Sequence, residues 1–112
     1  MNLLLVGLNH KTAPVEVRER VAFPEERLPE ALNTLRTDFG FQEAMILSTC
    51  NRVELIARPQ DECLRSDRLK EFLYSFHHLQ SPCLEPHLYS LTAKDTVRHV
   101  FRVASSLDSM VV

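Results

Sequence analysis

The sequence predicts an α+β domain with the ferredoxin-like βαββαβ order, a sandwich in which an antiparallel sheet carries two helices on one face. Two observations predict it. Two segments have apolar residues at helical spacing, and short apolar runs surround them in the order strand, helix, strand, strand, helix, strand. The 112 residues, 45% of them hydrophobic, suffice for one domain with one core. An additional C-terminal helix is expected beyond this fold.

The first half of the chain supplies a strand and the first core helix. An apolar run predicts a strand over 2–8, and residues 15–20 have the charge pattern of a solvated helix. Residues 25–39 predict an amphipathic helix, because Pro24 and two glutamates precede an apolar stripe and Gly40 follows it as a stop signal. The stripe consists of Leu28, Ala31, Leu32, Leu35 and Phe39.

The middle of the chain predicts a hairpin. Residues 44–47 read as a strand that leads into the polar run 48–52. From residue 53, apolar residues alternate with others, which is typical of a strand with one face on the core. In this segment Val53, Leu55 and Ala57 alternate with Glu54, Ile56 and Arg58.

The last part of the chain supplies a helix, a strand and a further helix. Ser66 is suited to the N-cap of the second core helix, and residues 88–91 predict a short final strand. Residues 94–106 predict the additional helix, with His99 beside its apolar stripe. The second core helix buries Leu69, Phe72, Leu73, Phe76 and Leu79, and the last helix is expected to turn Val97, Val100, Phe101 and Ala104 inward.

Composition excludes several classes of protein. The formal charge of −2 provides no global basic field for a polyanion, so any nucleic acid must bind locally. Two isolated glycines cannot form a dinucleotide-binding turn or a phosphate loop, so a nucleotide cofactor would be held outside these residues. No run is long enough to span a bilayer. Three cysteines without a CxxC pair support neither disulfides nor structural zinc and favour the reducing cytoplasm.

Cys50 is the candidate nucleophile. It lies in the polar run between two predicted strands, where side chains reach solvent and where Arg52 could favour the thiolate. The alternative is a cysteine buried as a small core residue. Thr49, Asn51 and Arg52 are either ordinary turn residues or ligands, since an arginine fork suits a substrate carboxylate. His99 is either a solvated histidine or a hydrogen-bonding partner of the site.

The remaining cysteines and histidines are weaker candidates. Cys63 stands beside two acidic residues, which disfavour a thiolate. A metal-binding sensor built from His77, His78 and Cys83 lacks convincing ligand spacing, so no metal site is predicted.

Three motifs resemble glutamyl-tRNA reductase over essentially the whole chain: 7–14 (GLNHKTAP), 48–54 (STCNRVE) and 99–109, which contains HVFRVA and LDS. The resemblance is to the N-terminal catalytic domain of that family. It implies that the Cys50 thiolate attacks the ester of glutamyl-tRNA, and that NADPH reduces the resulting thioester to glutamate semialdehyde for tetrapyrrole biosynthesis. It also implies that Thr49, Asn51, Arg52 and Ser109 hold the glutamyl group and that His99 assists catalysis.

The same resemblance implies what lies outside the chain. Residues 1–112 would be truncated before an NADPH-binding domain and a helical dimerisation domain, so this fragment alone is expected to lack reductase activity. The full-length enzyme is expected to be a cytoplasmic homodimer, with the downstream aminomutase as a further partner and no membrane association. Ser106 departs from the glycine usual in the family. The competing hypothesis is a non-catalytic ferredoxin-like module that binds RNA or protein, although the predicted strands lack aromatic stacking residues.

Overall fold

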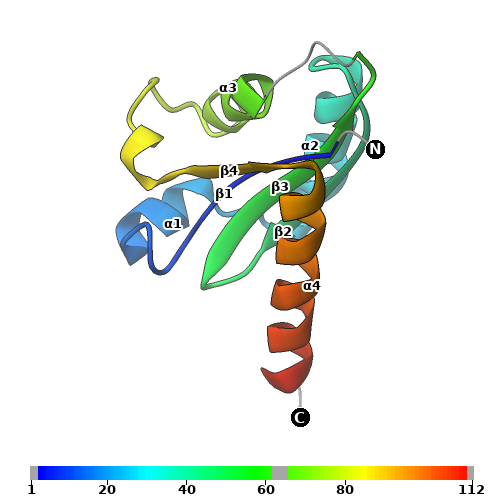
Figure 1. Cartoon of the computed structure of the whole chain (residues 1–112). Coiled ribbons are helices and arrows are strands. Elements are labelled where there is room, and N and C mark those ends of the chain that lie inside the picture. Colours follow the sequence, from blue (N-terminus) through cyan, green and yellow to red (C-terminus); the bar gives the residue numbers. More distant parts are fainter. Residues whose placement is uncertain (1–2, 62–65, 111–112) are drawn as a thin grey trace.

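A four-stranded antiparallel sheet organises the computed structural model, which describes residues 3–61 and 66–110 (Figure 1). Its strands lie in the order β2-β3-β1-β4, and each neighbouring pair is antiparallel. This order confirms the predicted ferredoxin-like fold. The strands are β1 (Leu4–Asn9), β2 (Phe41–Ser48), β3 (Arg52–Pro59) and β4 (Tyr89–Thr92).

The helices follow the predicted order. Those of the α type are α1 (Val15–Val21), α2 (Leu28–Thr37), α3 (Ser66–Phe76) and α4 (Ala93–Met110), and the short 3₁₀ turns are η1 (Glu25–Arg27) and η2 (Glu85–His87). The helix predicted from Glu25 therefore begins as a 3₁₀ turn, because Pro29 has no N–H to bond the Glu25 carbonyl and Leu28 donates to it instead. Gly40, with φ 81°, follows the end of α2 as expected.

One face of the sheet carries the main hydrophobic core. Alternate residues of β1 and β3 point into it, as the period of two predicts, and α2 and α3 cover it. Phe72 of α3 and Leu35 of α2 are fully buried there. Burial of a side chain of this size contributes about 1.5–3 kcal/mol, so this face supplies much of the stability of the fold.

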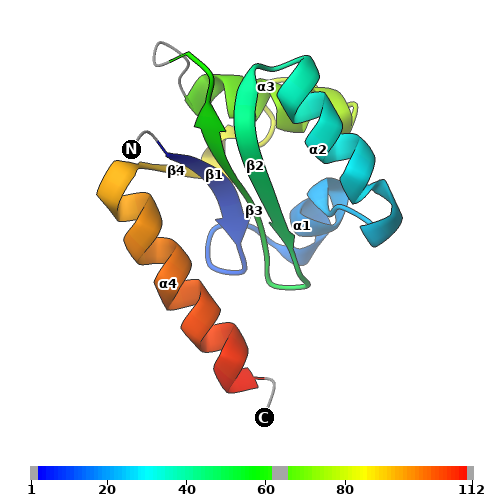
Figure 2. The same cartoon turned by 90° about the vertical axis from the view of Figure 1, so that its right-hand side faces the viewer.

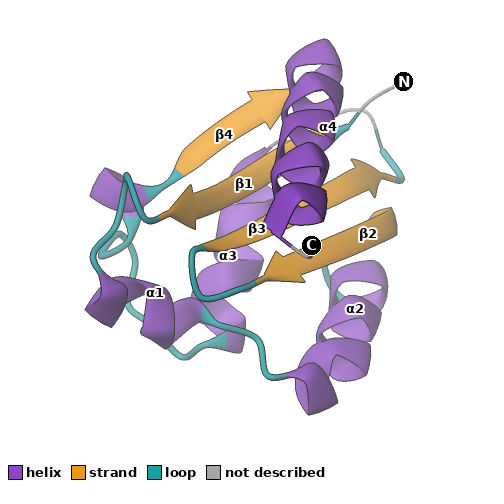
Figure 3. Ribbon diagram, turned by 90° about the horizontal axis from the view of Figure 1, so that it is seen from below, coloured by secondary structure: helices purple, strands orange, loops and turns teal. Residues whose placement is uncertain are grey.

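The opposite face of the sheet is covered in part by α4, as Figures 2 and 3 show. The predicted orientation of this helix is wrong at two positions: Val97 is 38% exposed and Ala104 is exposed, whereas Thr96 and Val103 are buried. The inward face is therefore rotated toward the side that carries His99. The rotation gives His99 a buried polar partner on β3, which an apolar pattern cannot reveal. The side chain of Phe101 lies outside the described part.

This arrangement sets the place of the site. The β2–β3 turn, the loop after β1 and the body of α4 meet at one end of the sheet (Figure 1). Within the described ranges, no helix combines the length and the apolar character needed to cross a bilayer.

Candidate active site

Cys50 lies at the tip of the β2–β3 turn and is exposed. Thr49 holds this turn closed. Its backbone N–H donates to the Arg52 carbonyl at 2.8 Å, and its Oγ1 accepts the backbone N–H groups of Asn51 and Arg52, each at 3.2 Å. The exposure of Cys50 contradicts the alternative of a buried core cysteine, and the bonds of Thr49 give that residue a structural role in the turn.

The loop after β1 packs beside this turn. The His10 N–H donates to the Asn51 carbonyl at 2.8 Å, and Arg18 Nε donates to the Cys50 carbonyl at 3.2 Å. Asn9 shapes the loop, because its Oδ1 accepts the backbone N–H groups of the second and third residues after it, at 2.9 and 3.2 Å. The first and second sequence motifs therefore form two loops joined by hydrogen bonds, a contact that the sequence analysis did not predict.

A cleft of about 470 Å³ lies between these loops and α4. The structure brings together five of the six predicted site residues here, from the turn and from the helix. Ser109 belongs to α4, but its side chain lies outside the described part. The residues that line the cleft are Asn9, His10, Lys11, Thr49, Cys50, Asn51, Arg52, His99, Arg102 and Val103.

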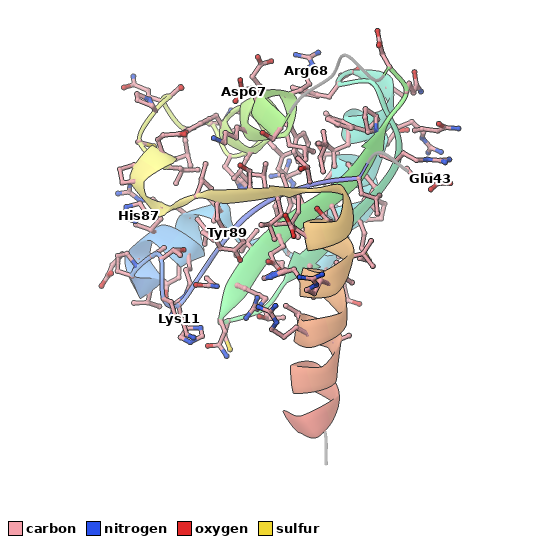
Figure 4. The ribbon with its side chains drawn as sticks, viewed as in Figure 1. Lys11, Glu43, Asp67, Arg68, His87 and Tyr89 are labelled. Atoms are coloured by element: carbon pink, nitrogen blue, oxygen red, sulfur yellow. The ribbon has the colours of Figure 1, made fainter. Side chains whose placement is uncertain are left out.

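The lining of the cleft is basic. Lys11, Arg52 and Arg102 contribute cationic side chains, and the described lining residues include no aspartate or glutamate. Figure 4 shows Lys11 at the tip of the loop after β1. A concave surface with this charge favours an anionic ligand, although the whole chain has a formal charge of −2. The sequence analysis missed Lys11 and Arg102, because no local pattern places them beside Cys50.

Arg52 joins the cleft to a buried carboxylate. Its Nη1 lies 3.6 Å from Glu54 Oε1, and only 19% of its side chain is exposed. That nitrogen is buried without a hydrogen-bond partner among the described residues. Arg52 also lines the cleft, so its guanidinium places a positive charge where an acidic ligand would bind. Its predicted effect on the thiolate of Cys50 stays a prediction.

Glu54 was missed by the sequence analysis, which placed it only in the alternating pattern of β3. Its side chain is only 1% exposed. Oε2 accepts the Tyr89 hydroxyl at 2.8 Å and lies 2.5 Å from His99 Nε2. Burial, followed by the hydrogen bond to the Glu54 carboxylate, raises the pKa of Tyr89. The only available signal was one charge inside the otherwise apolar run 53–57.

The other candidate residues lie elsewhere. Cys83 is exposed in the segment that follows α3, and Cys63 lies outside the described residues. His77 packs against the rings of Phe23 and Phe76, with centroids 4.6 and 5.4 Å away. In the ranges that the structure describes, no three His, Cys, Asp or Glu side chains gather as metal ligands.

Comparisons with known proteins agree with these motifs. Residues 6–112 match the family model described as glutamyl-tRNAGlu reductase, N-terminal domain. Curated relatives named glutamyl-tRNA reductase, from Trichlorobacter lovleyi and Geotalea uraniireducens, are 50% and 52% identical over 112 residues, which is 100% of this chain and 26% of each relative. The solved glutamyl-tRNA reductase from Methanopyrus kandleri aligns with a TM-score of 0.70 and 30% identity, over 96% of this chain and 23% of that one. The chain thus spans about a quarter of the length of the curated relatives it matches.

Proposed function

Because the chain belongs to the family of glutamyl-tRNA reductase N-terminal domains, we propose that it binds the glutamyl end of glutamyl-tRNA and transfers the glutamyl group to Cys50. The observation that carries the proposal is the meeting of Cys50, Arg52 and His99 in one cleft. Cys50 and Arg52 come from the β2–β3 turn and the start of β3, whereas His99 comes from α4, more distant along the chain. Nucleophilic acyl transfer needs an exposed thiol, a group that orients the acyl donor and a group that moves protons.

Arg52 is proposed to bind the side-chain carboxylate of the glutamyl group. Arg52 lines the cleft, and the other described lining residues are cationic or neutral. Asn51 is the second proposed ligand, since it lines the cleft and follows the nucleophile in sequence. Thr49 supports binding by shaping the turn, and the part of Ser109 stays a prediction.

The proposed reaction is an acyl transfer. The thiolate of Cys50 attacks the ester carbonyl that joins glutamate to the terminal ribose, the carbon–sulfur bond forms, and the carbon–oxygen bond to the ribose breaks. The products are a glutamyl thioester on Cys50 and free tRNA. His99 is proposed to move the proton between the sulfur and the ribose oxygen.

The described residues do not fit NADPH. Gly7 lies inside β1, Gly40 lies before β2, and the loop from β1 to α1 contains no glycine, so a dinucleotide-binding turn is absent from the described part. Reduction of the thioester by NADPH to glutamate semialdehyde is therefore proposed to depend on polypeptide outside this chain. For the whole protein, we propose a cytoplasmic homodimer that passes glutamate semialdehyde to an aminomutase.

The test is capture of the thioester on the full-length protein. With glutamyl-tRNA that carries radiolabelled glutamate, and without NADPH, label is expected to become bound to protein and to be released by hydroxylamine. Cys50→Ser is expected to abolish the label, whereas the exposed control Cys83→Ser keeps it. Binding of the RNA by the wild-type protein without any bound label would instead favour the non-catalytic module.

A further inference from the structure

The Glu54 carboxylate connects groups from three other positions of the fold. Its Oε2 contacts His99 of α4 and Tyr89 of β4, and its Oε1 lies beside Arg52 at the start of β3. A carboxylate with 1% exposure is strongly destabilising unless such partners surround it. The reaction described above uses Arg52 and His99 but gives no part to Glu54, which lies beneath both.

Gly7 makes this arrangement sterically feasible. It pairs with Glu54 on one neighbouring strand and with Tyr89 on the other, so the three residues form a row across β3, β1 and β4. A Cβ at position 7 would lie 2.7 Å from Glu54 Cγ. Because this Cβ is absent, the Glu54 side chain lies over β1 and the Tyr89 hydroxyl reaches it. Figure 4 shows Tyr89 leaving β4 on the side away from α3.

The contacts of Glu54 define which nitrogen of His99 carries hydrogen. Oε2 receives the hydroxyl hydrogen of Tyr89, and the Arg52 guanidinium, which only donates, lies beside Oε1. An ionised carboxylate only accepts hydrogen bonds, so the Nε2 contact at 2.5 Å requires a hydrogen on Nε2. A neutral imidazole with hydrogen on Nε2 has its lone pair on Nδ1.

We propose that Glu54 is a positioning residue that holds His99 in the Nε2–H tautomer and leaves Nδ1 to move the proton of acyl transfer. Nδ1 accepts the proton of the Cys50 thiol, the thiolate forms the bond to the ester carbon, and Nδ1 returns the proton to the ribose oxygen as the carbon–oxygen bond breaks. The catalytic role of His99 rests on the proposed function. The tautomer is a property of the protein without substrate.

Glu54→Gln tests the assignment because His99 in this variant is expected to adopt the tautomer opposite to that in the wild type. Arg52 can only donate, so the amide oxygen of Gln is expected to face Arg52 and the amide NH₂ to face His99. Nε2 must then accept, and the hydrogen moves to Nδ1. This exchange resembles the loss of the correct histidine tautomer when the aspartate of a serine protease triad becomes asparagine.

The measurement is the ¹⁵N chemical shift of the two ring nitrogens of His99 in full-length protein labelled on histidine. At about pH 8, where an ordinary imidazole is neutral, the wild type is expected to show hydrogen on Nε2 and Glu54→Gln on Nδ1. The matched control is Glu43→Gln on β2, where an exposed glutamate pairs with Arg58 at 3.3 Å and the tautomer of His99 should not change. Hydrogen on Nδ1 in the wild type overturns the proposal even if Glu54→Gln does not fold.

The second readout is the rate of thioester formation on the same proteins. Glu54→Gln is expected to slow it by about 10²- to 10⁴-fold at saturating glutamyl-tRNA, the range typical of lost proton transfer, while Glu43→Gln stays at the wild-type rate. A tautomer change without a slower rate overturns the positioning role. If the wild type forms no thioester, the proposed function fails, and the NMR result still decides the tautomer.

Discussion

Gly7→Ala is expected to destabilise the domain and to disturb the site, although the change adds one methyl group. The new Cβ would lie 2.7 Å from Glu54 Cγ, 2.8 Å from the Val53 carbonyl oxygen and 3.2 Å from Glu54 Cα. Ordinary carbon contacts are about 3.5–4.0 Å, so these neighbours must move by several tenths of an ångström or more. The carbonyl belongs to the backbone of β3, so β1 and β3 must separate at this point.

The expected magnitude combines two opposing effects. Overpacking of this kind typically costs about 1–3 kcal/mol. The smaller conformational freedom of alanine in the unfolded chain offsets about 0.4–1 kcal/mol of this. The net loss in the free energy of unfolding is therefore roughly 1–2 kcal/mol, a substantial part of the roughly 5–15 kcal/mol typical of a folded domain.

Urea unfolding followed by circular dichroism measures this change. With a slope of about 1–3 kcal/mol per molar urea, the midpoint is expected to fall by roughly 0.5–1 M. A double-mutant cycle of Gly7→Ala and Glu54→Ala separates the clash with the Glu54 side chain from the clash with the β3 backbone. Glu54→Ala removes Cγ but leaves the Val53 carbonyl in place. A Gly7→Ala midpoint equal to or above that of the wild type would refute the steric reasoning.

Two further predictions follow from the site and the core. Arg52→Lys keeps the positive charge but loses the planar fork, so the KM for glutamyl-tRNA in steady-state kinetics should rise about 10- to 100-fold with a smaller change in kcat, and an unchanged KM would contradict the carboxylate role. Burial lowers the pKa of His77 to about 4, with the Arg27 charge as the next cause, so the folded state favours the neutral ring. The wild type should therefore lose about 1–3 kcal/mol of stability in urea titrations as pH falls from about 6.5 to 4. His77→Phe should lose less stability over that pH range, whereas the exposed control His78→Asn should behave as the wild type.

The sequence alone determined the elements and their order. Alternation in β3 and the stripe of α3 are local patterns, because each element must bury one face and the period of the backbone decides which residues lie on it. The order of those elements leaves few ways to close an antiparallel sheet, so the ferredoxin-like fold followed. The polar run with Cys50 between two strands likewise predicted an exposed turn, which the structure has.

Only the tertiary structure decided the surroundings of Cys50 and His99. Glu54 occupies a position that alternation assigns to the outer face of β3, and its burial depends on α4, which crosses that face. The exposure of Val97 has the same reason, since α4 turns His99 toward Glu54 on β3 and Val97 lies beside that inward face. Burial of a charge is decided by its partners, and partners 35 and 45 residues away leave no trace in a local pattern.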